Sequence, residues 1–246
     1  MKLLILSDVH GNLTALEAVL AAEPSFDGVV FCGDAVDYGP DPAGCFERLR
    51  QLQPLVWVRG NHDNAAAFGI DCGCSQAYRE LSEASRRHTR AVLDPGTLQT
   101  LGRLPTEARS EFGGLPLYVT HATPRDNLFE YVSPDLDAET WEKAMGGAAP
   151  GTPGTPGTER YGGAVLVGHT HRPYVQRLGP LVVVNPGSVG QPRDKDPRAA
   201  YAVWTDGRFE LRRAAYDVAR VRRRLAATDL PPAVADALGR ILETGG

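Results

Sequence analysis

The first third of the chain alternates short apolar runs with segments of helical periodicity, and this alternation restricts the fold more than any other feature. Apolar runs at residues 2–7, 28–32 and 55–58 predict three strands. Residues 13–20 carry apolar side chains at helical spacing, and Asp41-Pro42 begins a helix predicted over 41–52. This βαβαβ order favours a parallel sheet that is buried on both faces.

The second half of the chain is richer in predicted strands and turns. Gly113-Gly114 predicts a hairpin between two strands at 109–112 and 115–120. Helices are predicted at 75–93 and, near the C-terminus, at 217–227 and 232–243. Further strands are predicted at 164–167, 174–178, 181–184, 200–204 and 209–213. Together these elements predict one domain over residues 1–246, with two sheets and outer helices.

One segment stands apart in composition. Residues 146–163 contain the tandem sequence GTPGTPGT between alanines and glycines. Such a segment cannot bury apolar surface, so we expect a flexible surface loop inserted into the domain.

Charge and hydropathy exclude two classes of protein. The formal net charge is −4, which argues against a protein that coats nucleic acid through bulk charge. No segment approaches the ~18 apolar residues of a membrane span, so we expect a cytoplasmic protein. In that compartment the four cysteines are expected to be free thiols, including Cys72 and Cys74 on a loop.

Polar side chains with metal-binding chemistry follow the predicted strands. Five of the six histidines stand beside Asp, Asn, Gly or Thr at strand ends, and only His88 falls in an ordinary amphipathic helix. The carboxyl ends of parallel strands meet at one edge, where open α/β sheets bind ligands. The sequence therefore predicts a metal centre at this edge, with the candidate ligands Asp8, His10, Asp34, Asn61, His121, His169 and His171.

The residue types suggest individual roles. The two carboxylate oxygens of Asp34 can bridge two cations, and Asn61 offers a neutral carbonyl oxygen. His62 follows Asn61 and need not bind a metal, so its imidazole can donate a proton to a leaving oxygen. Asp63 is expected to orient His62 or to stabilise its charge.

The ordered set of motifs resembles a known superfamily. Asp-x-His, Gly-Asp-x-x-Asp, Gly-Asn-His-Asp, a later His and Gly-His-Thr-His occur in the order found in calcineurin-like metallophosphoesterases. The segments 38–42 and 185–194 resemble the small bacterial branch of phosphodiesterases of the YfcE kind. The resemblance runs from Lys2 to about Arg213 and leaves out 146–163. One departure is Ala122-Thr123-Pro124, where related proteins more often have Gly-Ser-Pro.

The resemblance implies a fold and a sharing of ligands. The fold is a four-layer αββα sandwich of two mixed β-sheets flanked by helices, with the site at the strand ends. Two divalent metal ions are implied; manganese is the first expectation, and iron, nickel, zinc and cobalt also suit these ligands. One metal would take Asp8, His10, Asp34 and His171, and the other would take Asp34, Asn61, His121 and His169.

The predicted reaction is hydrolysis of phosphodiester, or of phosphomonoester, bonds in small molecules such as nucleotides. A hydroxide that bridges the metals would attack phosphorus while His62 protonates the leaving alkoxide. Arg59 is the first candidate for substrate contact, because related protein phosphatases use an arginine at this place to contact phosphate. Further candidates are Asn12, Tyr38, Arg125 and Arg193.

Two alternatives stay open. The Arg-Gly-Asn-His-Asp sequence also fits a protein Ser/Thr phosphatase or a dinucleoside-polyphosphate hydrolase. A non-catalytic binding scaffold is the alternative of another class, since the retromer subunit of this fold has lost its active centre. The presence of His62 and of all seven candidate ligands favours catalysis. The expected partner is a small phosphoester substrate, and self-association is left open.

Overall fold

Two five-stranded sheets form the centre of the molecule. The structure, a computed structural model, describes residues 1–146 and 163–246. The first sheet has the order β10-β9-β1-β2-β3 and the second the order β4-β5-β6-β8-β7. The strands of the first sheet are β1 (Lys2–Leu6), β2 (Gly28–Phe31), β3 (Val56–Trp57), β9 (Ala199–Thr205) and β10 (Arg208–Ala214). Those of the second are β4 (Glu107–Phe112), β5 (Leu115–Thr120), β6 (Ala164–Leu166), β7 (Tyr174–Leu178) and β8 (Leu181–Asn185).

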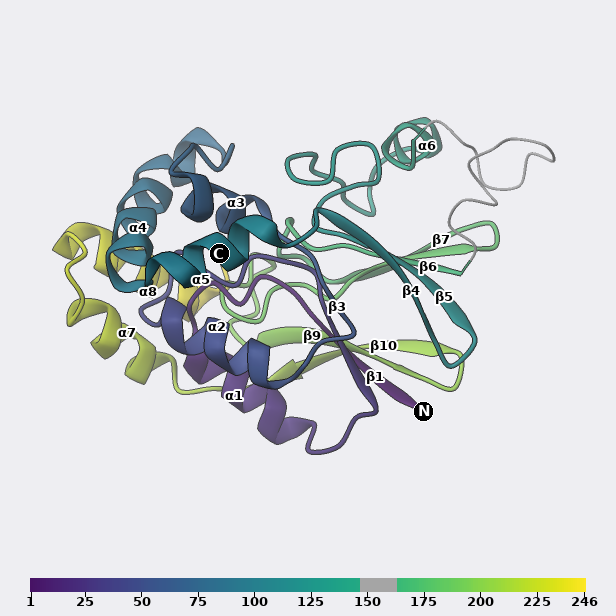
Figure 1. Cartoon of the computed structure of the whole chain (residues 1–246), viewed down its shortest axis with the longest axis horizontal. Helices are drawn as coiled ribbons and strands as arrows, with labels where there is room; N and C mark the ends of the chain where they lie inside the picture. Colours follow the sequence, from purple (N-terminus) through teal and green to yellow (C-terminus); the bar gives the residue numbers. More distant parts are fainter. Residues whose placement is uncertain (147–162) are drawn as a thin grey trace.

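Helices lie outside the two sheets, which gives the predicted four-layer sandwich (Figure 1). Helices α1 and α2 provide most of the cover on the outer face of the first sheet. In the described part of the chain, α6 is the one helix over the second sheet. The helices are α1 (Leu13–Ala22), α2 (Pro42–Gln51), α3 (Asn61–Phe68), α4 (Arg79–Val92), α5 (Pro95–Arg103), α6 (Ala138–Ala144), α7 (Val218–Ala226) and α8 (Pro232–Thr244).

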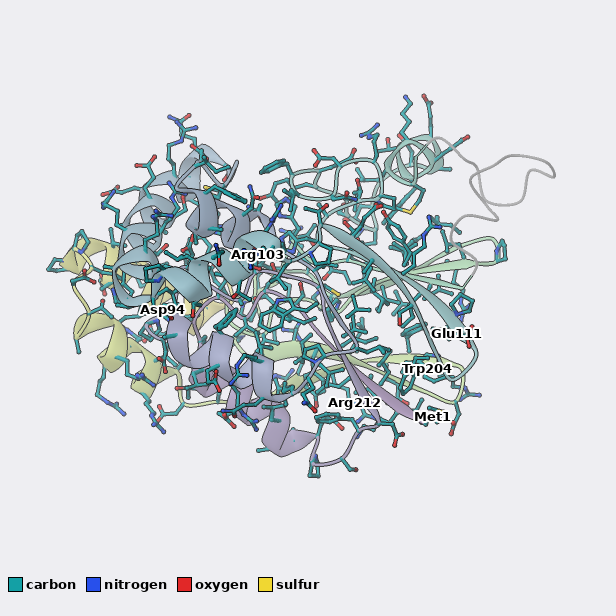
Figure 2. All side chains as sticks on the ribbon, viewed as in Figure 1. Met1, Asp94, Arg103, Glu111, Trp204 and Arg212 are labelled. Atoms are coloured by element: carbon teal, nitrogen blue, oxygen red, sulfur yellow. The ribbon has the colours of Figure 1, made fainter. Side chains whose placement is uncertain are left out.

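Strand β1 is apolar at every position after Lys2 because it is buried on both of its faces. In β1, Leu3 and Ile5 point into the core between the sheets, whereas Leu4 and Leu6 point toward the helices. This follows from the two-residue period of a strand, which sends neighbouring side chains to opposite faces. The strands of the second sheet alternate in the same way. Trp204 lies at one end of the core between the sheets (Figure 2). It packs edge-on to Phe112, with ring centroids 5.9 Å apart.

The parallel strands explain why the polar motifs come together. β1 pairs in parallel with β2, and β2 with β3. In the other sheet β5 pairs in parallel with β6. The loops that follow these five strands therefore leave the sheets at their carboxyl ends, and they carry all the candidate ligands.

Three helices were not predicted from the sequence. They are α3, α5 and α6; Figure 2 labels Asp94 and Arg103 at the two ends of α5. The segment from Asn61 to Asp63 is the first turn of α3. The predicted insertion at 146–163 lies outside the described residues except for its two ends. The remaining predicted strands and helices agree with the observed elements to within a few residues.

Two further observations concern membrane-spanning helices and disulfides. In the described ranges, no helix combines the length and the apolar character needed to cross a bilayer. All four cysteines are buried and free, so they form no disulfide.

The core between the sheets should dominate stability. Leu166 on β6 is fully buried there, and Leu166→Ala should lower the free energy of unfolding by about 2–5 kcal/mol through lost burial and a residual cavity. Leu211→Ala is the matched control, because Leu211 on β10 is 40% exposed and should cost far less. Urea unfolding followed by fluorescence measures both. Equal losses in the two variants would contradict this placement of the core.

Candidate metal centre

The seven candidate ligands all lie in loops or first turns that follow parallel strands. Asp8 and His10 follow β1, Asp34 follows β2, and Asn61 begins α3 after β3. The remaining three follow strands of the second sheet, namely His121 after β5 and His169 and His171 after β6. Each of these side chains is at most 3% exposed. The structure therefore brings together every residue that the sequence nominated as a ligand.

The backbone in these loops is unusual. Positive φ angles between 45° and 68° occur at Asp8, His10, Asp34, Asp37, Tyr38, His169 and His171, which are seven of the ten such non-glycine residues in the described chain. Side chains make this region of backbone space unfavourable, and it is found mainly where surrounding structure imposes it. Asp8 and His10 therefore do not continue the extended backbone of β1. The two side chains converge because the backbone turns sharply.

One group of ligand atoms surrounds a first candidate position. His171 Nε2 lies 3.2 Å from Asp8 Oδ1 and 3.1 Å from His10 Nε2. His10 Nε2 lies 3.7 Å from Asp8 Oδ1 and 3.8 Å from Asp34 Oδ2. These four side chains are the set that the resemblance implied for one metal.

A second group lies on the other side of Asp34. His121 Nε2 is 3.1 Å from Asp34 Oδ2 and 3.0 Å from Asn61 Oδ1. His169 Nδ1 is also 3.1 Å from Asn61 Oδ1. Asp34 Oδ2 thus lies between the two groups.

Backbone carbonyls fix which ring nitrogen of each histidine faces these groups. A carbonyl accepts only from a protonated nitrogen, so in a neutral ring the opposite nitrogen presents its lone pair to the centre. For His169 the Nε2–H points to the Phe129 carbonyl at 3.2 Å, which leaves Nδ1 facing the centre. For the others Nδ1–H donates: His10 to Val36 (2.9 Å), His121 to Cys32 (2.8 Å) and His171 to Gln191 (2.6 Å).

Hydrogen bonds also orient the carboxylates of Asp8 and Asp34 and the amide of Asn61. Asp8 Oδ2 accepts from the backbone N–H of His169, and Asp34 Oδ1 accepts from that of His62. The other oxygen of Asp8, Oδ1, is buried with no hydrogen-bond donor, and the other oxygen of Asp34, Oδ2, is buried beside the His121 ring nitrogen. Asn61 donates from Nδ2 to the Cys72 carbonyl at 2.7 Å, which turns its Oδ1 inward. Oxygen and nitrogen lone pairs without donors suit divalent cations, so these residues fit the implied metals.

Burial and charge set the proton affinities in the centre. Burial, the largest effect, lowers the pKa of His10 and His171 well below the usual value, so both rings are neutral. Burial also raises the pKa of Asp8. At Asp34 burial acts in the same direction, but His121 and His62 outweigh it and lower the pKa well below the usual value. Asp34 is therefore the carboxylate that stays ionised most firmly.

His62 lies beside the ligand groups, but its carboxylate partner is not the predicted one. Its Nδ1–H donates to Asp37 Oδ2 at 3.0 Å. Burial lowers the pKa of His62, yet Asp34 and the Asp37 hydrogen bond outweigh burial and raise it to about 10. Asp37 is the final residue of the Gly-Asp-x-x-Asp motif, so the sequence contained the signal for this residue.

Asp63 has a different role from the predicted one. Its Oδ2 accepts from the backbone N–H of Asp34 (2.8 Å) and of Gly60 (3.2 Å), and its Oδ1 accepts from that of Ala35 (2.9 Å). The carboxylate therefore ties the loop after β2 to the start of α3. It positions Asp34 and does not hold the His62 ring.

Three of the predicted substrate residues are used for structure. The Arg59 guanidinium donates to the Gly102 carbonyl and stacks on Phe68, which corrects its nomination as first phosphate contact. Asn12 is the N-cap of α1 and also donates to the Gly190 carbonyl. Arg125 pairs with Glu130 in its own loop.

The other two predicted substrate residues lie at the centre. The Tyr38 ring packs against His62 at 4.7 Å and His10 at 4.9 Å between centroids. Arg193 lies over that ring at 5.8 Å and donates from its backbone to the His171 carbonyl. Within the described residues no carboxylate lies within ion-pair distance of Arg193, so its charge is available to an anion.

The chain resembles known proteins over this same region. A family model described as the calcineurin-like phosphoesterase superfamily domain matches residues 1–207, which include every candidate ligand. An uncharacterised protein of Methanocaldococcus jannaschii is 30% identical over 249 residues, covering 92% of this chain and 93% of that protein. The crystal structure of a metallophosphoesterase from Sphaerobacter thermophilus matches with a TM-score of 0.77 and 31% identity, covering 100% of each chain. The phosphodiesterase YfcE of Escherichia coli is 37% identical over 75 residues, covering 26% of this chain and 41% of that protein.

The role of Asp63 is open to test. In Asp63→Asn the amide group must face a backbone N–H whichever way it turns, so we expect a loss of about 1–3 kcal/mol in unfolding free energy. Asp94→Asn is the matched control, because the exposed Asp94 caps α5 through backbone N–H groups and asparagine caps equally well. Chemical denaturation measures both. If Asp63→Asn were as mild as the control, the anchoring role would be refuted.

Proposed function

The chain belongs to the calcineurin-like phosphoesterase superfamily and is a phosphoric ester hydrolase, and from this we propose that it cleaves phosphodiester bonds of small molecules at a two-metal centre. One ion would be held by Asp8, His10, Asp34 and His171. The second would be held by Asp34, Asn61, His121 and His169, with Asp34 Oδ2 shared. Manganese remains the first expectation for both positions.

One observation carries the proposal of bound cations. His10 Nε2 and His171 Nε2 lie 3.1 Å apart, and each ring already donates its Nδ1–H to a carbonyl. Both rings are neutral, so two lone pairs face one another with the orphaned Asp8 Oδ1 beside them. Such an arrangement is repulsive unless a cation lies between the lone pairs.

The chemistry divides between the ions and the side chains. Two bound cations supply Lewis acidity toward the phosphate oxygens and toward the attacking water. His62 is positioned to give a proton to the leaving oxygen, since Asp37 holds its Nδ1 and raises the proton affinity of the ring. Arg193 offers an unpaired positive charge to a phosphate oxygen.

The enclosure of the centre supports a small substrate. His62 is only 3% exposed, and no candidate ligand exceeds that value. A phosphorylated side chain on a folded protein would need a more open surface, so this observation disfavours the protein phosphatase alternative. The scaffold alternative is disfavoured because the proton donor and the ligands are all present and oriented.

The acid role of His62 predicts a dependence on the leaving group. With manganese-loaded protein, His62→Asn should lower kcat for an alkyl-leaving diester such as a dinucleotide by about 10²–10⁴-fold. The loss should be smaller for bis-p-nitrophenyl phosphate, whose phenolate leaves without much help. Initial rates on both substrates give the comparison.

A matched control is available on α4. His88 is also buried and pairs with Asp229 away from the centre, so His88→Asn should retain activity on both substrates. An equal loss on both substrates in His62→Asn would contradict proton donation. Inactivity of the wild-type chain with every divalent metal tried would refute the proposed function.

The shared position of Asp34 predicts the metal content of two variants. Asp34→Asn should reduce bound manganese from two ions toward none, because both positions lose an anionic ligand. Asp37→Asn should keep both ions and lose activity, since Asp37 contacts His62 and no ligand atom. Elemental analysis after gel filtration measures the content. Two ions retained by Asp34→Asn would exclude the bridging role.

A further inference from the structure

A cavity borders the centre beside His169 and His171. It has a volume of about 480 Å³, and its walls include Tyr78, Tyr131, Thr170, Arg172, Arg193 and Lys195. Thr170 stands between the two histidines in sequence. The Tyr131 ring stacks on the His169 ring, with centroids 4.0 Å apart and planes 34° apart. The cavity therefore shares a wall with the candidate metal centre.

Three positive charges in this cavity lack anionic partners. Among the described residues, no carboxylate lies within ion-pair distance of Arg172, Arg193 or Lys195. The acidic neighbours in sequence are used elsewhere, because Asp194 pairs with Arg213 and Asp196 with Arg198. Arg193 Nε is buried without a hydrogen-bond acceptor. A wall of this kind is suited to an anion with several oxygens.

Aromatic rings provide a second kind of contact. Arg193 stacks over the Tyr78 ring at 4.1 Å, which holds guanidinium and ring together as one surface. Tyr131 covers His169 with one face and is 47% exposed. Its outer face is therefore accessible to a planar ring, and Val132 and Leu136 extend the apolar part of the wall.

The Tyr38 ring connects the cavity wall to the proton donor. Arg193 lies over the Tyr38 ring, and the Tyr38 ring packs against His62. A group that leaves toward this cavity would depart past the residue that protonates it. The entering water would then approach from the opposite side of the phosphorus, as in-line displacement requires.

We propose that this cavity receives the leaving group, and that the leaving group is a nucleotide, with its base against Tyr78 or Tyr131 and its own phosphate against Arg172, Arg193 and Lys195. The inference rests on the proposed function for the bond that is cut. The inference adds that the released alcohol carries both a planar ring and a negative charge. The volume is sufficient, since pockets for ligands of this size occupy about 300–1,000 Å³.

The test separates the cavity from the metal centre. Adenosine 5′-monophosphate and adenosine are titrated by calorimetry into manganese-loaded full chain, and the cavity variants report how much of the binding comes from the cavity. The nucleotide should bind about tenfold or more tightly than the nucleoside, as expected for charge-assisted contacts. The double variant Arg172→Gln with Lys195→Gln should lose most of this preference, because it removes two exposed charges.

Two further variants sharpen the interpretation. Tyr78→Leu should weaken nucleotide and nucleoside by the same factor, since it removes a ring contact common to both. Arg177→Gln is the matched control, because Arg177 on β7 is exposed and lies outside the cavity. Its preference should equal that of the wild type.

The outcomes distinguish this inference from the proposed function. Hydrolysis of bis-p-nitrophenyl phosphate by the same preparation reports the chemistry alone. Hydrolysis without preference for the nucleotide, or a preference retained by the double variant, overturns the cavity assignment and leaves the function intact. A preference without any hydrolysis overturns the role as a leaving-group site, because no group then leaves.

Discussion

The convergence of unshared lone pairs at one point is the interaction on which the rest of the structure depends. Asp8 Oδ1 and the inward nitrogens of His10 and His171 face one another in a buried space. Neither hydrogen bonding nor protonation of His10 and His171 relieves this crowding, because carbonyls hold the Nδ1–H groups and burial keeps the rings neutral. The proposed divalent cations would relieve this electrostatic cost, and the relief would contribute to their binding energy.

Backbone hydrogen bonds between the loops hold the candidate ligands in this unfavourable arrangement. The backbone N–H groups of Asp8 and His10 donate to the loop after β2, and that of Gly190 donates to the Asp8 carbonyl. Gly39 and Gly190 permit the close approach, since a Cβ at either position would meet the backbone of the neighbouring loop. The positive φ angles of the ligands persist because these contacts allow no relaxed alternative. The strained backbone, the burial of the site and the ligand geometry therefore all depend on these contacts between the loops.

The ends of the strands were predictable from sequence, and so was the convergence of the candidate ligands, because both follow from local patterns. Apolar runs that stop at Gly, Asp or His fix where a parallel strand ends, and parallel strands share an edge. The partners of His62 and Asp63 were not predictable in this way. Which carboxylate meets the His62 ring depends on how the loop after β2 folds over α3, and Asp37 and Asp63 are equally plausible on spacing alone. Arg59 was misjudged for the same reason, since its acceptor, Gly102, belongs to a helix that the sequence pattern did not reveal.

The candidate metal ligands and the residues that line the neighbouring cavity are distributed differently along the chain. The ligand set is written in short motifs, each attached to its own strand, so the chemistry survives wherever the two sheets form. The cavity beside it is assembled from Tyr78 before α4, Tyr131 in the loop before α6, and Arg193 in the loop before β9. None of these residues is a candidate ligand, yet Tyr131 stacks on His169 and Arg193 bonds to the His171 backbone. If the cavity holds the leaving group as proposed, a change in these loops should alter which group is accepted without dismantling the candidate metal centre, whereas a change in the candidate ligands should remove the reaction for every substrate. The short motifs would then specify the reaction, and the cavity would specify the substrate.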